Sequence, residues 1–248
     1  MVKTWLCWSG GKDSAYALEV ARSLQGIEIV GLLTTLSAEL DRISMHGVRR
    51  ELLEEQAEVL GLPVEKVFLP TPPRDAQCRL SAAATGFTVF ASNDSYETAM
   101  LAAFQRARNS GVQGIVFGDI YLEDLRRYRE MLLARAGLQG IFPLWGRSSR
   151  ELVAQIIDAG IRSTVVCVDA NRLERSFCGR ELDHSFVAQL PRDADPCGER
   201  GEYHTFVHDA PAFRRPIACS KAECVWREPF WFCDLAPAGA KPLLARAG

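Results

Sequence analysis

The sequence lacks several features that would point to particular classes of protein. No apolar run approaches the roughly 18 residues that a membrane-spanning helix needs. The Walker phosphate-binding pattern GxxxxGK[ST] is absent, and no two cysteines form a CxxC pair. The chain also begins without the layout of a signal peptide, so we expect a cytoplasmic protein with no membrane partner.

The cysteines do not predict a metal centre. There are eight, at positions 7, 78, 167, 178, 197, 219, 224 and 233. Cys7 and Cys167 lie in apolar, strand-like runs, where cysteine behaves as a small hydrophobic residue. Cys219 and Cys224 have no nearby pair or histidine to complete a zinc site, and His184, His204 and His208 have no ligand spacing either. We interpret the set as reduced thiols.

A basic surplus is missing as well. The net charge is −2 and the sequence pI is about 6.1, whereas proteins that hold nucleic acids usually carry a basic face. Arg126, Arg127 and Arg129 alternate with acidic residues, which favours a solvated, salt-bridged helix face. We therefore expect a small molecule or a protein side chain as substrate, and no nucleic-acid partner.

Strand-like and helix-like segments alternate along the first two-thirds of the chain. Ile27–Thr34 is a continuous apolar run, as is typical of a strand buried on both faces of a parallel sheet. Further strands and helices are predicted as follows: strands at Thr4–Trp8, Val64–Leu69, Gly114–Phe117 and Thr164–Val168; helices at Asp13–Ser23, Val48–Leu60, Tyr96–Asn109, Asp124–Ala136 and Ser149–Ala159. This alternation predicts an α/β fold with a mainly parallel sheet.

The pattern changes after Asp169, which predicts a second, smaller unit. Tyr203–Val207 and Ala222–Phe232 each resemble one strand. We place a nucleotide-binding domain at 1–143, a smaller α/β substrate domain at 144–235 and a flexible tail at 236–248. The connection at 72–93 is longer than such links normally are, and its role is open.

Ser9-Gly10-Gly11-Lys12-Asp13-Ser14 is the strongest chemical signal, because it lies directly between the first strand and the first helix. Two glycines let backbone N–H groups turn toward an anion, and a helix N-terminus adds partial positive charge. Lys12 can neutralise phosphate charge, Ser9 and Ser14 can donate hydroxyl hydrogen bonds, and Asp13 can cap the helix or hold Mg²⁺ through water. The segment therefore predicts a phosphate-binding loop.

A second loop follows at Cys197-Gly198-Glu199-Arg200-Gly201-Glu202-Tyr203. Gly198 and Gly201 predict a tight turn with exposed N–H groups, while Glu199 and Glu202 can hold an ammonium ion or a cationic substrate. A solvated hairpin turn is the alternative for both glutamates. Cys197 is a candidate nucleophile, but we favour a packing role because a neighbouring carboxylate disfavours the thiolate.

The first loop resembles SGGxDS, the PP-loop of the ATP pyrophosphatase superfamily. The segment from Asp195 to Phe206 resembles the CGExGEYxTF signature of diphthine–ammonia ligases, and Gly179 to Asp183 resembles the segment that precedes it. Gly118-Asp119-Ile120 and Pro143-Leu144-Trp145 also fall in family order. The resemblance extends from Lys3 to about Phe213 and implies an adenine nucleotide alpha hydrolase-like fold.

On this basis the expected site has two parts. The ATP-binding residues are expected to be Ser9, Gly10, Gly11, Lys12, Asp13, Ser14, His46 and Gly118, the last two because they follow strands. The acceptor and catalytic residues are expected to be Cys197, Gly198, Glu199, Gly201, Glu202, Tyr203 and Thr205. For His46 a helix-cap or core position is an equal alternative.

The resemblance implies ATP-dependent amidation. ATP, with Mg²⁺, adenylates a carboxylate and releases pyrophosphate, and free ammonia then displaces AMP. The implied acceptor is diphthine, a modified histidine of elongation factor 2, or a small carboxylate; a homodimer is one possibility, and the oligomeric state is open. An RNA-modifying PP-loop enzyme and a non-catalytic ATP-binding regulator are the alternatives. An RNA-modifying enzyme would require a basic face, and a regulator would not need the loop at Cys197–Tyr203.

Overall fold

The computed structural model describes residues 1–44, 46–70 and 93–239, and the link at 72–92 and the end of the tail lie outside them. The elements of the first half are β1 (Val2–Cys7), α1 (Lys12–Ser23), β2 (Ile27–Ser37), β3 (Arg42–Ile43), α2 (Arg50–Leu60), β4 (Val64–Leu69), α4 (Asn93–Asn109), β5 (Gly114–Val116), α5 (Glu123–Ala136) and β6 (Gln139–Ile141). Those of the second half are α6 (Ser149–Asp158), β7 (Arg162–Asp169), the 3₁₀ turn η1 (Arg175–Phe177), α7 (His184–Gln189), β8 (Tyr203–Asp209), β9 (Cys219–Arg227) and β10 (Phe230–Pro237). Within the described ranges, no helix has the length and apolar character to cross a membrane.

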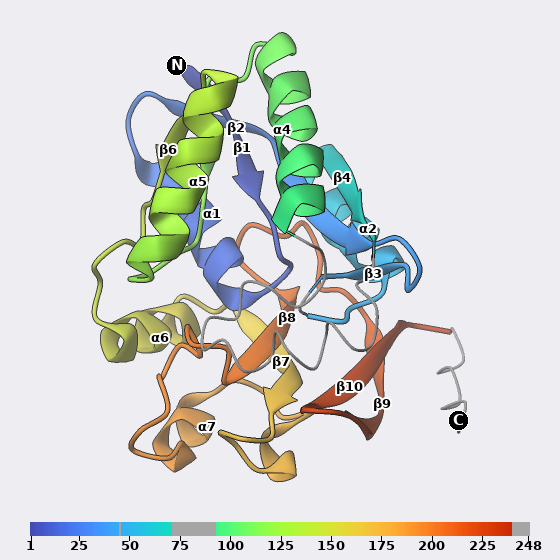
Figure 1. Ribbon diagram of the computed structural model, residues 1–248. Coiled ribbons are helices and arrows are strands. Elements are labelled where there is room, and N and C mark those ends of the chain that lie inside the picture. Colours follow the sequence, from blue (N-terminus) through green and yellow to red (C-terminus); the bar gives the residue numbers. More distant parts are fainter. Residues whose placement is uncertain (45, 71–92, 240–248) are drawn as a thin grey trace.

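The first sheet is parallel except at one end (Figure 1). β1 pairs with β2 on one side and β5 on the other, and β6 follows β5. The long strand β2 pairs with β4 through its second half, and the short β3 runs antiparallel at its end. The predicted α/β class with a parallel sheet is confirmed, while the short strands β3 and β6 were not predicted.

Helices cover both faces of this sheet. Because successive residues of a strand point to opposite faces, Leu32 and Leu33 belong to different buried clusters. Leu32 shares a cluster with Leu18 of α1 and Leu52 of α2, whereas Leu33 shares one with residues of α4 and α5. This three-layer arrangement leaves the carboxyl ends of the strands free to carry loops, which is where α/β folds bind ligands.

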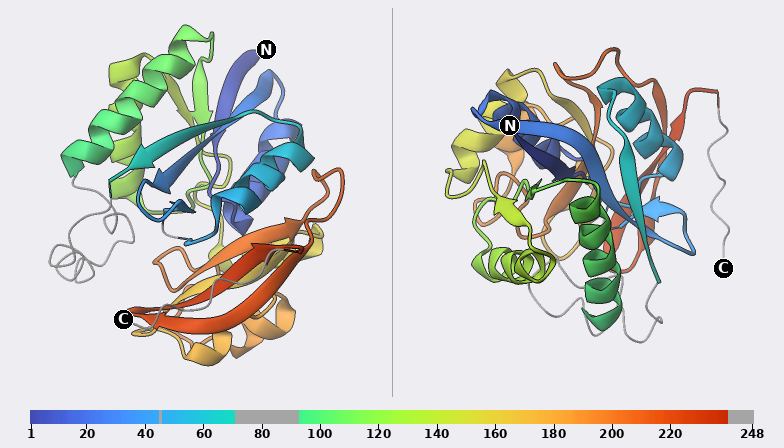
Figure 2. Two further views of the ribbon diagram at one scale, coloured as in Figure 1. Left: turned by 90° about the vertical axis from the view of Figure 1, so that its right-hand side faces the viewer. Right: turned by 90° about the horizontal axis from the view of Figure 1, so that it is seen from above.

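The second sheet is antiparallel, in the order β8-β7-β10-β9, and lies below the first in Figure 2. Two predictions need correction here. β7 does not continue the parallel pattern, because both its neighbours run antiparallel to it. The single strand predicted at Ala222–Phe232 is a hairpin, because the chain turns at Glu228–Pro229 and proline cannot donate a ladder hydrogen bond.

The expected tail also begins too early, since β10 continues to Pro237. Residues 236 and 237 pair with Ser220 and Cys219 of β9. The tail proposed at 236–248 is therefore wrong for its first two residues, which are held by the strand ladder.

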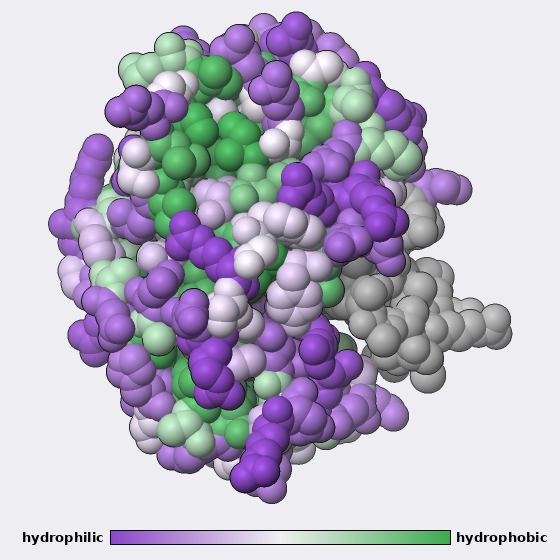
Figure 3. Space-filling view, turned by 90° about the vertical axis from the view of Figure 1, so that its left-hand side faces the viewer, coloured by the Kyte–Doolittle hydropathy of each residue, from purple (hydrophilic) through white to green (hydrophobic). Residues whose placement is uncertain are grey.

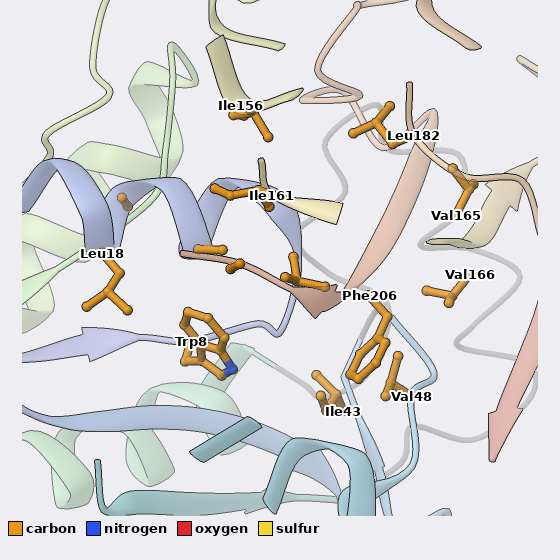
Figure 4. Packing of buried hydrophobic residues seen from close by; sticks show 14 of the residues in the cluster. Trp8, Leu18, Ile43, Val48, Ile156, Ile161, Val165, Val166, Leu182 and Phe206 are labelled. Carbon is orange, nitrogen blue, oxygen red and sulfur yellow. The ribbon is translucent and has the colours of Figure 1, made fainter. Parts of the chain in front are cut away.

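One buried cluster joins the two sheets. It includes Trp8 and Leu18 from the first half and Val166 and Phe206 from the second, and Figure 4 shows Phe206 beside Ile43 and Val48. The Trp8 indole donates to Gln56 Oε1 at 2.9 Å. The chain therefore carries its two sheets on a shared apolar core, and the division at residue 143 stays a prediction.

The arginine-rich segment lies on α5. Arg126 and Arg127 form ion pairs one turn away, with Glu130 at 2.8 Å and Glu123 at 3.0 Å, as predicted for a solvated face. Arg129 differs, because it is largely buried and pairs with Asp119 at 2.9 Å. The side of the molecule that faces left in Figure 1 mixes hydrophilic and hydrophobic surface (Figure 3).

Candidate active site

The Ser9–Ser14 loop joins β1 to α1 at the carboxyl edge of the parallel sheet. Gly10 has a φ of +77°, a backbone conformation that favours glycine. The Ser14 hydroxyl donates to Gly11 O at 2.9 Å, and Ser9 Oγ lies 3.3 Å from Ser14 Oγ. Gly11 is the N-cap residue of α1, and the helix has no side-chain cap, so the predicted capping role of Asp13 is wrong.

Lys12 is buried at the junction of the two sheets. Its Nζ lies 2.8 Å from Asp13 Oδ2, donates to the Cys197 carbonyl and sits 5.1 Å from the centre of the Tyr203 ring. Burial alone would lower the pKa of Lys12, but the Asp13 carboxylate more than offsets this and holds the pKa above its ordinary value. Lys12 is therefore a fixed cation at the start of α1.

The second signature segment lies directly against the first. The backbone N–H of Lys12 donates to Thr205 Oγ1 at 3.0 Å, and Val207 N donates to Gly10 O at 2.9 Å. A Cβ at Gly11 would lie 3.1 Å from Thr205 O, so close contact with β8 requires a small residue there. Two motifs almost 190 residues apart in sequence thus form one site.

The acceptor loop, residues 195–203, uses its own carboxylates to hold its backbone. Asp195 Oδ1 accepts from Cys197 N at 2.9 Å and from Glu199 N at 3.1 Å. Glu202 accepts from Asp195 N at 3.0 Å and from Arg200 N at 3.1 Å. The expectation of exposed N–H groups in this turn is therefore wrong, because these donors are satisfied within the loop.

The two glutamates of the acceptor loop have different environments. Glu202 is fully buried, and both its oxygens accept backbone hydrogen bonds. Glu199 is half-buried and accepts from Ile120 N at 2.9 Å. Neither is a solvated turn residue; Glu202 braces the loop, whereas Glu199 reaches across to the segment that follows β5.

The pKa of Glu199 is raised to about 8. Burial is the main cause, and the nearby carboxylates of Asp13 and Asp119 add to it, against the opposing effect of Lys12. Glu199 is thus a carboxyl group that gains and loses a proton around pH 8, near Asp13 and Lys12 of the Ser9–Ser14 loop. Perturbed groups of this kind are typical of active sites.

Cys197 is placed as a packing residue. Its thiol is buried and donates to Ser149 O at 3.2 Å. Burial raises the pKa of Cys197 to about 12, with only partial compensation from Lys12. The thiolate that a nucleophile needs is therefore disfavoured, mainly by burial.

His46 and Gly118 border the loop, as expected from their positions after strands. His46 Nδ1 lies 2.9 Å from Thr205 O, and since a carbonyl only accepts, Nδ1 carries the proton. Burial lowers the pKa of His46 to about 4, so the ring is neutral. A Cβ at Gly118 would lie 3.0 Å from Asp13 O, and this close approach explains the glycine.

Four site residues were not singled out from the sequence. Gln56 donates to Gly10 O at 3.0 Å and to Val207 O at 2.7 Å, which ties α2 to both signature segments. Ser149 donates to Asp195 Oδ1 at 2.8 Å, and Asp119 pairs with Arg129. Asp195, quoted only as part of a motif, organises the acceptor loop. A glutamine on the apolar face of α2 was the one available signal for Gln56.

The site contains a carboxylate oxygen that could bind a metal ion, but not a cluster of metal ligands. Among the described residues, no three His, Cys, Asp or Glu side chains gather as metal ligands. Asp13 Oδ1 is buried without a hydrogen-bond partner. Mg²⁺ usually binds through one or two carboxylates together with water and substrate phosphates, so a single carboxylate of this kind fits that ion.

Comparison with known proteins agrees with this geometry. Residues 2–72 match the family described as the diphthamide synthase N-terminal domain, and residues 148–239 match the diphthamide synthase C-terminal domain. The human diphthine–ammonia ligase is 29% identical over 230 residues, which cover 88% of this chain and 82% of that protein. The bovine enzyme of the same name is 29% identical over 246 residues, covering 92% and 86%.

Two further matches are more partial, one in the share of the relative that is covered and one in structural similarity. The diphthine–ammonia ligase of Schizosaccharomyces pombe is 25% identical over 227 residues, but these make up only 36% of that longer protein. A U34-tRNA thiolase structure from Methanococcus maripaludis matches with 16% identity and a TM-score of 0.34, over 63% of this chain and 56% of that one. That likeness is too low to support an argument.

The family matches, together with the parallel sheet and the Ser9–Ser14 loop, place the chain in the class of PP-loop, ATP-dependent ligases. Within that class, the chain belongs to the diphthine–ammonia ligase (diphthamide synthase) family.

Proposed function

We propose that this chain is a carboxylate–ammonia ligase that works through an acyl-adenylate. A carboxylate oxygen of the acceptor attacks the α-phosphorus of ATP, and pyrophosphate leaves. Ammonia then attacks the acyl carbon, the amide forms and AMP leaves. Diphthine on elongation factor 2 is the proposed acceptor, since the family relatives are named for it, and free ammonia is the proposed nitrogen source.

The contact between the two signature loops supports this proposal most strongly. Lys12 lies within the PP-loop yet donates to the Cys197 carbonyl of the acceptor loop. The same lysine can therefore hold the leaving phosphates while the acceptor loop lies against them. Catalysis of this kind depends on positioning and on charge stabilisation at the phosphates.

Asp13 is the residue that would hold Mg²⁺, through its unpartnered Oδ1. The ion would supply charge neutralisation on the phosphate oxygens. The chain's own contribution is the cation of Lys12, the hydroxyls of Ser9 and Ser14, and the N-terminal end of α1.

Glu199 is the proposed proton acceptor for ammonia. Its position beside Asp13 and Asp119 suits a cation better than a phosphate, because like charges repel at close range. A pKa of about 8 makes ionised Glu199 a stronger base than an ordinary carboxylate, so it can bind ammonium and take a proton from it, and the ionised form predominates above about pH 8. Loss of this proton leaves neutral ammonia next to the activated acyl group, which it then attacks.

The products of ATP turnover test this proposal. With ATP, ammonium and diphthine-bearing elongation factor 2, we expect AMP and pyrophosphate in equal amounts when nucleotides are separated by anion-exchange chromatography. ADP and phosphate as main products would reject the PP-loop chemistry. AMP formation without an amide on the acceptor would retain that chemistry and reject the acceptor.

A further inference from the structure

Three thiols lie close together: Cys224 and Cys233 on neighbouring strands of the second sheet, and Cys178 directly after η1. Cys233 on β10 lies directly opposite Cys224 on β9. Both sulfur atoms lie 3.4 Å from the point that a Cβ of Gly179 would occupy. Burial and the neighbouring Cys224 thiol both raise the pKa of Cys178 and of Cys233.

The register of the hairpin favours a bond between Cys224 and Cys233. Arg227 and Phe230 close a two-residue turn and form a hydrogen-bonded pair, so the pairs alternate from there. Cys224 and Cys233 therefore form a non-hydrogen-bonded pair, whose Cα atoms are about 4.5 Å apart. A disulfide needs about 4.4–6.8 Å, so this pair lies at the short end of the accessible range.

The three thiols differ in access. Cys224 is half-buried, whereas Cys178 and Cys233 are buried. Cys178 Sγ donates to Trp231 O at 3.6 Å, and Cys233 Sγ donates to Ala222 O at 3.6 Å, so both are held beside Cys224. A half-buried thiol with a buried partner next to it is the arrangement of an attacking and a resolving cysteine.

We propose that Cys224 and Cys233 are a redox modification site that reacts with small-molecule disulfides, with Cys178 as the alternative partner of Cys224. The Cys224 thiolate attacks one sulfur of the oxidant, and one small thiol leaves. The Cys233 thiol, held beside Cys224, then loses its proton as its sulfur attacks Cys224 Sγ, and the second small thiol leaves. The two protein thiols lose two electrons and two protons, and the oxidant disulfide becomes two thiols.

Tryptic cleavage makes the site easy to map. Lys221 and Arg227 bracket Cys224 on one peptide, and Cys233 lies on the next, so a link between them joins two separate peptides. The test uses the full chain with Cys78→Ser, which removes the thiol outside the described residues. Reduced protein is exposed to oxidised glutathione, free thiols are blocked, and the peptides are analysed by mass spectrometry.

We expect a loss of two protons in the intact mass and a link between the Cys224 and Cys233 peptides. Cys224→Ser should abolish the link, and Cys219→Ser, at the other end of β9, should leave it unchanged. In Cys233→Ser the link should move to Cys178. A stable glutathione adduct on Cys224, or an equal yield of the link in urea-unfolded protein, would overturn the proposal, and melting curves confirm that each variant is folded.

Discussion

The two loops of the proposed site handle charge in opposite ways. The PP-loop presents a buried cation and a helix N-terminus without a side-chain cap. The acceptor loop turns its backbone donors inward onto Asp195 and Glu202, and it presents the Glu199 carboxyl. The difference teaches that one loop suits an anion and the other suits a cation or a proton, although they touch through Lys12 and Cys197.

The largest expected effect is on the PP-loop side. Lys12→Met, which keeps most of the side-chain volume, should slow pyrophosphate release by about 10²–10³-fold, since it removes a cation that stabilises the transition state. Pyrophosphate release is measured by a coupled assay under saturating ATP. Lys3→Met on the exposed part of β1 is the matched control and should retain full activity.

Because Lys12 also bonds the Cys197 carbonyl, its loss leaves a buried acceptor unsatisfied. We expect a stability cost of about 1–3 kcal/mol, which a melting curve reports separately. Pyrophosphate release at the wild-type rate by a folded Lys12→Met protein would remove the PP-loop from the mechanism.

The second effect tests whether the acceptor loop serves amide formation separately from ATP binding. Glu199→Gln should slow amide formation at least about tenfold, or about 1.4 kcal/mol in the barrier, because the proton acceptor is lost. ATP affinity, measured by calorimetric titration, should stay within a few-fold. Glu151→Gln on the exposed face of α6 is the control. If ATP binding collapses while the melting temperature holds, the acceptor loop belongs to the nucleotide site.

The third effect separates Glu199 from Glu202. Glu202→Gln replaces an acceptor of two backbone hydrogen bonds, so one N–H is left facing an amide NH₂ group. We expect a loss of about 1–3 kcal/mol in the free energy of unfolding, measured by urea denaturation. The slope of the free energy of unfolding against urea concentration should not change. An unaltered stability would contradict the bracing role of Glu202.

The last effect is the pH dependence of stability. The folded protein holds a proton on Glu199 up to a pKa of about 8, whereas the unfolded chain loses it near the ordinary value of about 4.3. This contribution is fully present below about pH 4.3 and is lost as pH rises through 8. Glutamine cannot ionise, so the melting temperature of Glu199→Gln should rise relative to wild type between pH 5 and pH 9. An identical difference at both pH values would reject the raised pKa.

Much of the fold was predictable because parallel strands are continuous apolar runs. Val64–Leu69 matches β4, and Ile27–Thr34 gave all but the end of β2. Short strands such as β3 were not predictable, because two residues carry no periodicity. The β9–β10 hairpin was missed because Val225-Trp226 and Phe230-Trp231-Phe232 resemble parts of one strand, and only Glu228–Pro229 marks the turn between them.

The two loops of the candidate site could be located in the sequence, but their arrangement could not. Both loops were located from their glycines and charges. Their contact through Lys12, Cys197 and Thr205 depends on tertiary structure that no local pattern encodes. The same applies to Glu202, whose burial distinguishes it from Glu199 three residues earlier.

The transfer of oxygen from acceptor to nucleotide tests the central claim most directly. An acceptor carboxylate labelled with ¹⁸O is incubated with ATP, ammonium and the enzyme, and AMP and pyrophosphate are analysed by mass spectrometry. An acyl-adenylate requires one acceptor oxygen to leave on AMP, so we predict one ¹⁸O atom per AMP and none in pyrophosphate. Amide formation with unlabelled AMP, or with ¹⁸O in inorganic phosphate, would contradict the account.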